Sequence, residues 1–156
     1  MSHQVTTVYQ QPLNLDPARV ETPAYVVDLS LLKKNLELLA QVEKAALAGQ
    51  TQARVVVKIN ALTDAELIHA LLRAAQAGAK VDLIVRGACS LVPGAKGLSE
   101  NIRVFSIVDR FLEHSRIYYF QQSEAMYLSS ADWMPRNFFS RLEIAFPVLD
   151  RRLYRF

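Results

Sequence analysis

The sequence predicts an α/β fold, with a mixed sheet built on a βαβ unit between residues 53 and 86. The first strand, ARVVVKIN (53–60), has a β-branched core typical of strands that are buried on both faces. The second strand, KVDLIVR (80–86), has the same character, and an amphipathic helix lies between them. A strand, a helix and a strand in so short a segment favour two parallel strands with a right-handed crossover.

The pattern between these strands predicts one helix with marked ends. Thr63 opens the helix, and Glu66 completes a capping box with it. Gly78 stands where the helix is expected to end, since glycine readily adopts the left-handed conformation found there. Apolar residues form one stripe between these ends: Leu67, Ile68, Leu71, Leu72 and Ala75.

Ahead of this unit, the sequence predicts a shorter strand and a longer helix. TPAYVVDL (22–29) is an apolar run expected to form a buried strand, and residues 30–47 are expected to form a helix. Asp28 or Ser30 is available as its N-cap, and Gly49 ends it. The apolar residues at helical spacing are Leu32, Leu36, Leu39, Val42 and Ala46.

The two ends of the chain are less regular. Residues 1–20 are polar, contain Pro12 and Pro17, and are expected to form a poorly ordered leader. After the βαβ unit, residues 87–101 form a predicted loop with Pro93, Gly94 and Gly97, and shorter strands follow. These strands, separated by turn residues, are expected at 102–108, 116–120, 126–130 and 141–148.

Composition bounds the function. The 156 residues suit one ordinary domain, and a formal net charge of +3 is too small to indicate a nucleic-acid partner. A single cysteine, Cys89, excludes an internal disulfide framework and a cysteine-rich zinc site. The sequence shows neither an apolar run of membrane-spanning length nor a secretory signal, so a cytoplasmic protein is expected. Peripheral association with a membrane is left open.

Arg86 is the first candidate for a binding residue. It ends a buried strand and is followed by Gly87, and ligands of open α/β sheets bind beyond the carboxyl ends of the strands. Glycine allows the backbone to approach a ligand closely. A guanidinium at this place can hold phosphate oxygens in a bidentate manner. The alternative is that Arg86 forms a salt bridge with Asp82 or faces water.

His114 and Arg116 form a second candidate pair. They are two residues apart, so in an extended segment both side chains point to one face. An imidazole beside a cation suits protonation of a phosphate oxygen or stabilisation of developing charge. A surface pair without function is the alternative. His3, in the leader, and His69, on the exposed side of a helix, are weaker candidates.

Small polar residues at the ends of strands complete the predicted site. Ser129 and Ser130 follow a strand and can hold an anion, although they equally suit an ordinary turn or helix cap. Lys58 and Asn60 end the first strand of the βαβ unit, where they can bind phosphate or simply meet solvent. Because these residues converge with Arg86 on one edge of the sheet, we predict phosphate binding and phosphoryl transfer.

From about residue 44 onward, the sequence resembles the C-terminal catalytic region of bacterial polyphosphate kinases. The blocks that carry the resemblance are VVVKINALTDAELI, AAQAGAKVDLIVRGACSLVPGAKGLSENIRVFSIVDRFLEHSR and YLSSADWMPRN. The resemblance implies reversible transfer of the terminal phosphate of ATP to polyphosphate, with Mg2+ and a phosphohistidine. It also implies a fold like one half of a phospholipase D. Arg86 falls on the nucleotide-binding arginine, and His114 falls on the second active-site histidine.

Departures from the family pattern predict an incomplete enzyme. The phosphorylated histidine, the magnesium-linked arginines and a nucleotide-site tyrosine lie upstream in the family and have no counterpart here. ATP or ADP and polyphosphate are the expected ligands, and no residue of this chain is assigned to a metal. Complementation by the missing N-terminal half, a homo-oligomer and a non-catalytic nucleotide- or polyphosphate-binding remnant are the alternatives.

Residues 21–47 resemble the opening strand and helix of carboxynorspermidine decarboxylases, which are pyridoxal-phosphate enzymes. An alternative function is therefore a decarboxylase-like piece with Lys58 as the Schiff-base lysine. The expected division is a leader (1–20), a strand-helix segment without a native partner (21–47) and a polyphosphate kinase domain (48–156), with a join near residues 41–50.

Overall fold

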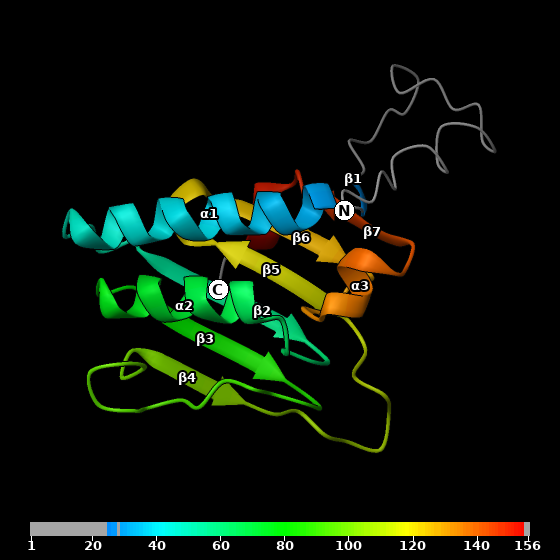
Figure 1. Cartoon of the computed structure of the whole chain (residues 1–156). Coiled ribbons are helices and arrows are strands. Elements are labelled where there is room, and N and C mark those ends of the chain that lie inside the picture. Colours follow the sequence, from blue (N-terminus) through cyan, green and yellow to red (C-terminus); the bar gives the residue numbers. More distant parts are fainter. Residues whose placement is uncertain (1–24, 28, 155–156) are drawn as a thin grey trace, which may run out of the picture.

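A seven-stranded mixed sheet forms the centre of the molecule, in a computed structural model that describes residues 25–27 and 29–154 (Figure 1). The strand order is β1-β7-β6-β5-β2-β3-β4. The strands are β1 (Tyr25–Val27), β2 (Arg54–Ile59), β3 (Lys80–Val85), β4 (Ile102–Phe105), β5 (Arg116–Phe120), β6 (Ala125–Ser129) and β7 (Glu143–Pro147). β2, β3 and β4 are parallel, which confirms the βαβ prediction, and every other pairing is antiparallel.

Two long helices lie on one face of this sheet (Figure 1). They are α1 (Leu29–Leu47) and α2 (Ala65–Gln76), and the shorter helices are η3 (Gln121–Ser123), α3 (Pro135–Phe139) and η4 (Arg151–Tyr154). The predicted helices at 30–47 and after Thr63 are therefore present. Residues 1–24 and 28 lie outside the described residues. The predictions of a leader, of the start of the first strand at residue 22 and of an Asp28 cap therefore fall outside them, as does His3.

The ends of α2 differ in how well they were predicted. The N-cap is Asp64, whose side chain accepts a hydrogen bond from the N–H of Leu67 at 3.0 Å, so the prediction that Thr63 opens the helix is wrong by one residue. The N–H groups of both Thr63 and Asp64 donate to the carbonyl of Trp133, and the capping bond is made by the Asp64 side chain. At the other end, Gly78 has φ +107°, as predicted for a left-handed residue after the helix.

Later strands are shorter than their sequence patterns. β4 covers Ile102–Phe105 rather than 102–108, and β7 covers Glu143–Pro147 rather than 141–148. β6 is shifted to Ala125–Ser129, and β5 matches its prediction. β4 stops at Phe105 because its parallel ladder with β3 ends there, opposite Ile84.

Burial alternates along β2, so the prediction of burial on both faces is wrong. Val55, Val57 and Ile59 are buried under the helices, whereas Val56 and Lys58 on the opposite face are half-buried. That opposite face also carries Phe146, which is 39% exposed. The alternation follows from the arrangement of layers, because α1 and α2 both lie on the same face (Figure 1).

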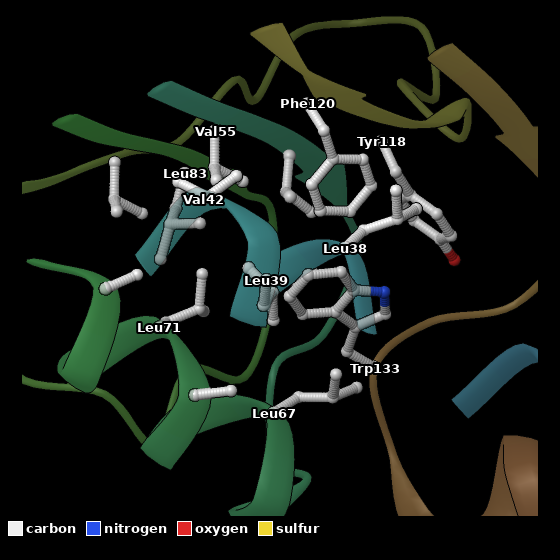
Figure 2. Packing of buried hydrophobic residues seen from close by; sticks show 14 of the residues in the cluster. Leu38, Leu39, Val42, Val55, Leu67, Leu71, Leu83, Tyr118, Phe120 and Trp133 are labelled. Carbon is white, nitrogen blue, oxygen red and sulfur yellow. The ribbon is translucent and has the colours of Figure 1, made fainter. Parts of the chain in front are cut away.

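The core joins α1 to the rest of the molecule. Leu39 and Val42 of α1 and Leu67 and Leu71 of α2 are buried in one cluster with the strands beneath them. The indole of Trp133 lies among them, 5.4 Å from the Tyr118 ring between centroids (Figure 2). β1 pairs with β7. The expectation that the strand and helix ahead of the βαβ unit lack a partner is therefore wrong for the described residues.

Replacement of Leu39 by alanine tests how firmly α1 is held. Leu39 is fully buried, so the variant is expected to lose about 2–5 kcal/mol of unfolding free energy, through lost apolar contact and a residual cavity. Leu47→Ala on the same helix is the control, because Leu47 is 71% exposed and its loss should change little. Urea denaturation measures both. Similar midpoints for the two variants would contradict this packing.

Candidate functional site

The predicted site residues gather at one edge of the sheet, and the strand directions explain why. The parallel strands β2 and β3 end there, so Asn60 and Arg86 follow neighbouring strands. β5 runs antiparallel to β2, which brings its first residue, Arg116, to the same edge. β6 runs antiparallel to β5, so Ser129 at its end pairs with Arg116.

Arg86 is held at this edge by one nitrogen. Its Nε donates to Oδ1 of Asn60 at 2.9 Å, and Asn60 itself is buried. In the part of the chain that the structure describes, neither terminal guanidinium nitrogen of Arg86 donates to a protein acceptor. Asp82 accepts hydrogen bonds from Arg54 and Arg103 and does not pair with Arg86, so of the two alternatives the salt bridge with Asp82 is wrong.

Asp132, in the loop after β6, is the acceptor at the centre of the site. Its Oδ1 accepts from the Asn60 backbone N–H at 2.7 Å and from Asn60 Nδ2 at 3.2 Å. Arg116 donates to both carboxylate oxygens, each at 3.0 Å. Burial raises the pKa of Asp132, but the hydrogen bonds from Arg116 and Asn60 outweigh it and hold the pKa below its usual value.

Arg116 is occupied by the protein on all three nitrogens. Besides the two bonds to Asp132, its NH1 donates to the backbone carbonyl of His114 at 3.2 Å. Its side chain is 12% exposed. Phosphate binding by Arg116 stays a prediction, and the geometry gives the residue a second task, which is to fix the backbone at His114.

His114 lies exposed at the end of the loop that precedes β5. Lys58 binds this loop through its Nζ, which donates to the carbonyl and the hydroxyl of Ser115 at 3.1 and 2.8 Å. The same Nζ lies 3.4 Å from a carboxylate oxygen of Glu113. Lys58, Glu113 and Arg86 also line one shallow crevice. The backbone carbonyls of His114 and Ser115 are therefore held, by Arg116 and by Lys58 respectively.

The two serines are bound within the turn after β6. Ser129 Oγ donates to the Ile144 carbonyl at 3.1 Å, and Ser130 Oγ donates to Glu143 Oε2 at 2.5 Å. Ser130 also accepts from the Ile144 N–H at 2.9 Å. These bonds match the ordinary turn that the sequence left open, and anion binding by the serines stays a prediction.

Gly87 is required by a close approach within the protein. A Cβ atom at this position would lie 2.9 Å from the Asn60 carbonyl oxygen, which accepts the Gly87 N–H at 2.8 Å. The sequence suggested that this glycine makes room for a ligand, whereas the atom it makes room for is a neighbouring backbone oxygen. Glycine therefore allows the loops after β2 and β3 to lie together.

Asp132 is the site residue that sequence reasoning missed. Its partner Asn60 is 72 residues away, so no local pattern joins them. The available signal was an acidic residue directly before a tryptophan in a turn that follows a strand, in SSADW. Of the weaker candidates, His69 lies exposed on α2, away from this network.

The arrangement suits an anionic ligand. Among the described residues, the two terminal guanidinium nitrogens of Arg86 have no protein acceptor. The exposed imidazole of His114 follows on a loop that two cationic residues anchor. Such donors stabilise phosphate oxygens and can supply a proton to them. A group of three or more His, Cys, Asp or Glu side chains able to hold a metal ion is absent from the described residues.

Comparison with solved structures identifies the fold as that of the phospholipase D family. The crystal structure of Nuc from Salmonella typhimurium, a phospholipase D family member, aligns with 86% of this chain and 90% of its own at a TM-score of 0.53 and 11% identity. NucT from Helicobacter pylori aligns with 85% and 87% at a TM-score of 0.57 and 15% identity. At these identities the likeness concerns the fold alone.

Sequence comparison then shows the family. Residues 25–155 match the model of the polyphosphate kinase C-terminal domain 2, and the chain belongs to this family. Polyphosphate kinase from Paraburkholderia phytofirmans is 52% identical over 150 residues. The crystal structure of polyphosphate kinase from Porphyromonas gingivalis aligns with 90% of this chain at 40% identity and a TM-score of 0.80. The resemblance found in the sequence is confirmed.

Coverage limits what the family membership implies. The match with the Paraburkholderia enzyme covers 95% of this chain but only 19% of that enzyme. The match with the Porphyromonas structure covers 22% of that chain. Because the family match begins at residue 25, it includes the segment that resembles carboxynorspermidine decarboxylases, and the decarboxylase alternative is not supported. None of the helices within the described ranges is long and apolar enough to cross a membrane.

Acid denaturation tests the charge of Asp132. The lowered native pKa means that the ionised carboxylate stabilises the fold above the unfolded pKa of about 4, and that this contribution is lost as the pH falls through the native pKa. Asp132→Asn should lower the unfolding free energy at pH 7 by up to about 3 kcal/mol. It should also depend less on pH between about pH 5 and pH 2 than the parent chain.

Urea midpoints at pH 7 and pH 3 measure this difference. Asp109→Asn is the matched control, since Asp109 is exposed and its carboxylate accepts only from the neighbouring Arg110 N–H. Parallel pH profiles for the parent and the Asp132 variant would show that the carboxylate carries no such stabilisation.

Proposed function

We propose that this chain forms the nucleotide- and phosphate-binding part of a polyphosphate kinase, which catalyses ATP + polyphosphate(n) ⇌ ADP + polyphosphate(n+1). Family membership supports the reaction class. The observation that carries the proposal for this chain is the state of Arg86. Asn60 orients it through Nε, and both terminal nitrogens are without an acceptor in the described ranges 25–27 and 29–154.

Arg86 would bind phosphate oxygens of ATP. A guanidinium held through Nε presents its two terminal nitrogens in a fixed plane, which matches the spacing of two phosphate oxygens. Because Asn60 is buried and the Arg86 side chain is half-buried, little side-chain freedom remains to be lost on binding.

His114 would act on the phosphate that moves. The loop around it is anchored while the imidazole is exposed, so the ring can approach a bound phosphate without a large rearrangement of the backbone. As a general acid, the imidazolium would donate a proton to the leaving phosphate oxygen. This role belongs to the proposal. So does ligand binding by five further residues: Lys58, Asn60, Arg116, Ser129 and Ser130.

Magnesium would enter as part of the substrate. The described residues do not fit a protein-held Mg2+, because their most central carboxylate, Asp132, is committed to Arg116 and Asn60. Oxygen ligands from the phosphates of ATP are the usual partners of this ion. The cation would therefore accompany the nucleotide, and no step of the reaction is assigned to it.

We also propose that catalysis needs a second part, which supplies the histidine that is phosphorylated. Sequence blocks of the family that contain this residue have no counterpart in this chain. An N-terminal polyphosphate kinase half is the expected partner, with a homo-oligomer as the alternative, and sedimentation of the chain alone and mixed with that half separates the two. A cytoplasmic location stays a prediction.

Arg86→Ala should weaken the binding of ATP by roughly 10- to 100-fold, as expected for the loss of hydrogen bonds to a charged group. His114→Ala should weaken it much less, because the imidazole is assigned to transfer rather than to binding. Isothermal titration of the purified chain with MgATP measures both variants. Arg73→Ala is the control, since Arg73 lies on α2, away from the site, and pairs with Glu43 of α1. An unchanged affinity for Arg86→Ala would contradict the assigned role.

Incubation with γ-32P-labelled ATP and magnesium tests whether the chain is catalytically incomplete. The chain alone should acquire no acid-labile, base-stable label, because the residue that carries the phosphoryl group belongs to the proposed second part. Addition of an N-terminal polyphosphate kinase half should place the label on that half. Acid-labile label on this chain alone would show that it contains its own phosphorylatable histidine.

A further inference from the structure

The buried carboxylate of Asp132 joins the two residues that the proposed function assigns to phosphate. On one side, Asp132 accepts two hydrogen bonds from Asn60, which in turn accepts one from Arg86. On the other side, it accepts two from Arg116, which also donates to the His114 carbonyl. One unbroken series of hydrogen bonds therefore runs from the Arg86 guanidinium to the backbone of His114.

We propose that Asp132 is the positioning residue of this site, and that its carboxylate sets the places of Arg86 and His114 relative to each other. For the identity of the ligand this inference rests on the proposed function. The coupling itself rests on the hydrogen bonds alone.

The amide of Asn60 makes the coupling directional. Its Nδ2 donates to Asp132, which turns Oδ1 toward Arg86 as the acceptor for Nε. If the amide were reversed, Nδ2 would face the Arg86 N–H and two donors would oppose each other. The carboxylate, which can only accept when ionised, therefore decides which atom Asn60 presents to Arg86.

On the side of Arg116, the charge of Asp132 likewise fixes the orientation of its partner. Arg116 is nearly buried, and a buried cation needs an anionic partner. Asp132 provides it with a bidentate pair, in which Nε meets Oδ1 and NH2 meets Oδ2. The remaining NH1 then lies where it reaches the His114 carbonyl. Without this pair, Arg116 would be free to turn toward an incoming phosphate and the His114 backbone would lose its partner.

Two variants separate the two sides. Asp132→Asn keeps Oδ1, which accepts from Asn60 and from Arg116 Nε, but it places an NH2 group opposite Arg116 NH2 and removes the negative charge. The pair with Arg116, and with it the connection to His114, should therefore weaken first. Asn60→Ala removes the acceptor for Arg86 and leaves Asp132 and Arg116 paired. Asp132→Ala should release both sides.

The test is an NMR measurement on the whole 15N-labelled chain without ligand. The Nε–H signals of Arg86 and Arg116 should be resolved and should exchange slowly with water, because both donate to protein oxygens. Asn60→Ala should accelerate exchange of the Arg86 signal at least tenfold and spare Arg116. Asp132→Asn should spare the Arg86 signal and accelerate exchange at Arg116, most strongly at the NH2 group, which loses its acceptor Oδ2. Asp132→Ala should affect both residues. Glu43→Ala is the control, since it should alter only the Arg73 signal.

Titration with tripolyphosphate then connects positioning to binding. Asp132→Ala and Asn60→Ala should each raise the dissociation constant at least tenfold. If the parent chain binds no tripolyphosphate, the proposed function fails, whereas the coupling is still decided by the NMR signals. If the Arg86 signal is unchanged in Asp132→Ala, the positioning role of Asp132 is overturned, whatever Asn60→Ala does. Should Asp132→Ala not fold, Asp132→Asn decides the question, and an unchanged Arg116 signal in that variant overturns the role.

Discussion

β2 occupies the position on which the site depends, because it pairs parallel with β3 on one side and antiparallel with β5 on the other. Two strands therefore end, and a third begins, at one edge of the sheet. Arg86 and Arg116 come from opposite sides of β2, where Arg86 bonds to Asn60 and Arg116 bonds to Asp132, the partner of Asn60. A change in the pairing of either neighbour would separate the two guanidinium groups, whatever residues the strands carried.

A buried anion follows from this arrangement. Two guanidinium groups brought to one edge repel each other, and one of them, Arg116, has little access to water. Asp132 compensates for that charge, and its pKa is lowered as a result. The same carboxylate satisfies the backbone N–H of Asn60, which has left the ladder at the end of β2. Electrostatics and backbone hydrogen bonding thus require an acceptor at the same point.

Local sequence patterns predicted most of the fold. The predictions were wrong in detail where contacts between residues distant in the sequence decide the structure. The succession of strand, helix and strand patterns in residues 53–86 indicated the parallel βαβ unit, since these patterns are local properties of the sequence. α2 starts one residue later than predicted because the side chain of Asp64, and not that of Thr63, caps it. Burial of both faces of β2 was wrong, because sequence does not reveal that α1 and α2 share one face. Asp132 was not predicted as a site residue because its partner Asn60 is remote in the sequence.

Arg86 and Arg116 show why residue type alone does not assign a site. Both carry the same charge and both follow or begin a strand at the same edge, so the sequence offered them as equal candidates. The structure distinguishes them by the number of nitrogens already in use, one for Arg86 and three for Arg116. An arginine whose nitrogens are all engaged holds its neighbours in place, and one held only through Nε can still accept a ligand. The division of work between them is therefore set by one acceptor, Asp132, which engages Arg116 directly and reaches Arg86 only through Asn60.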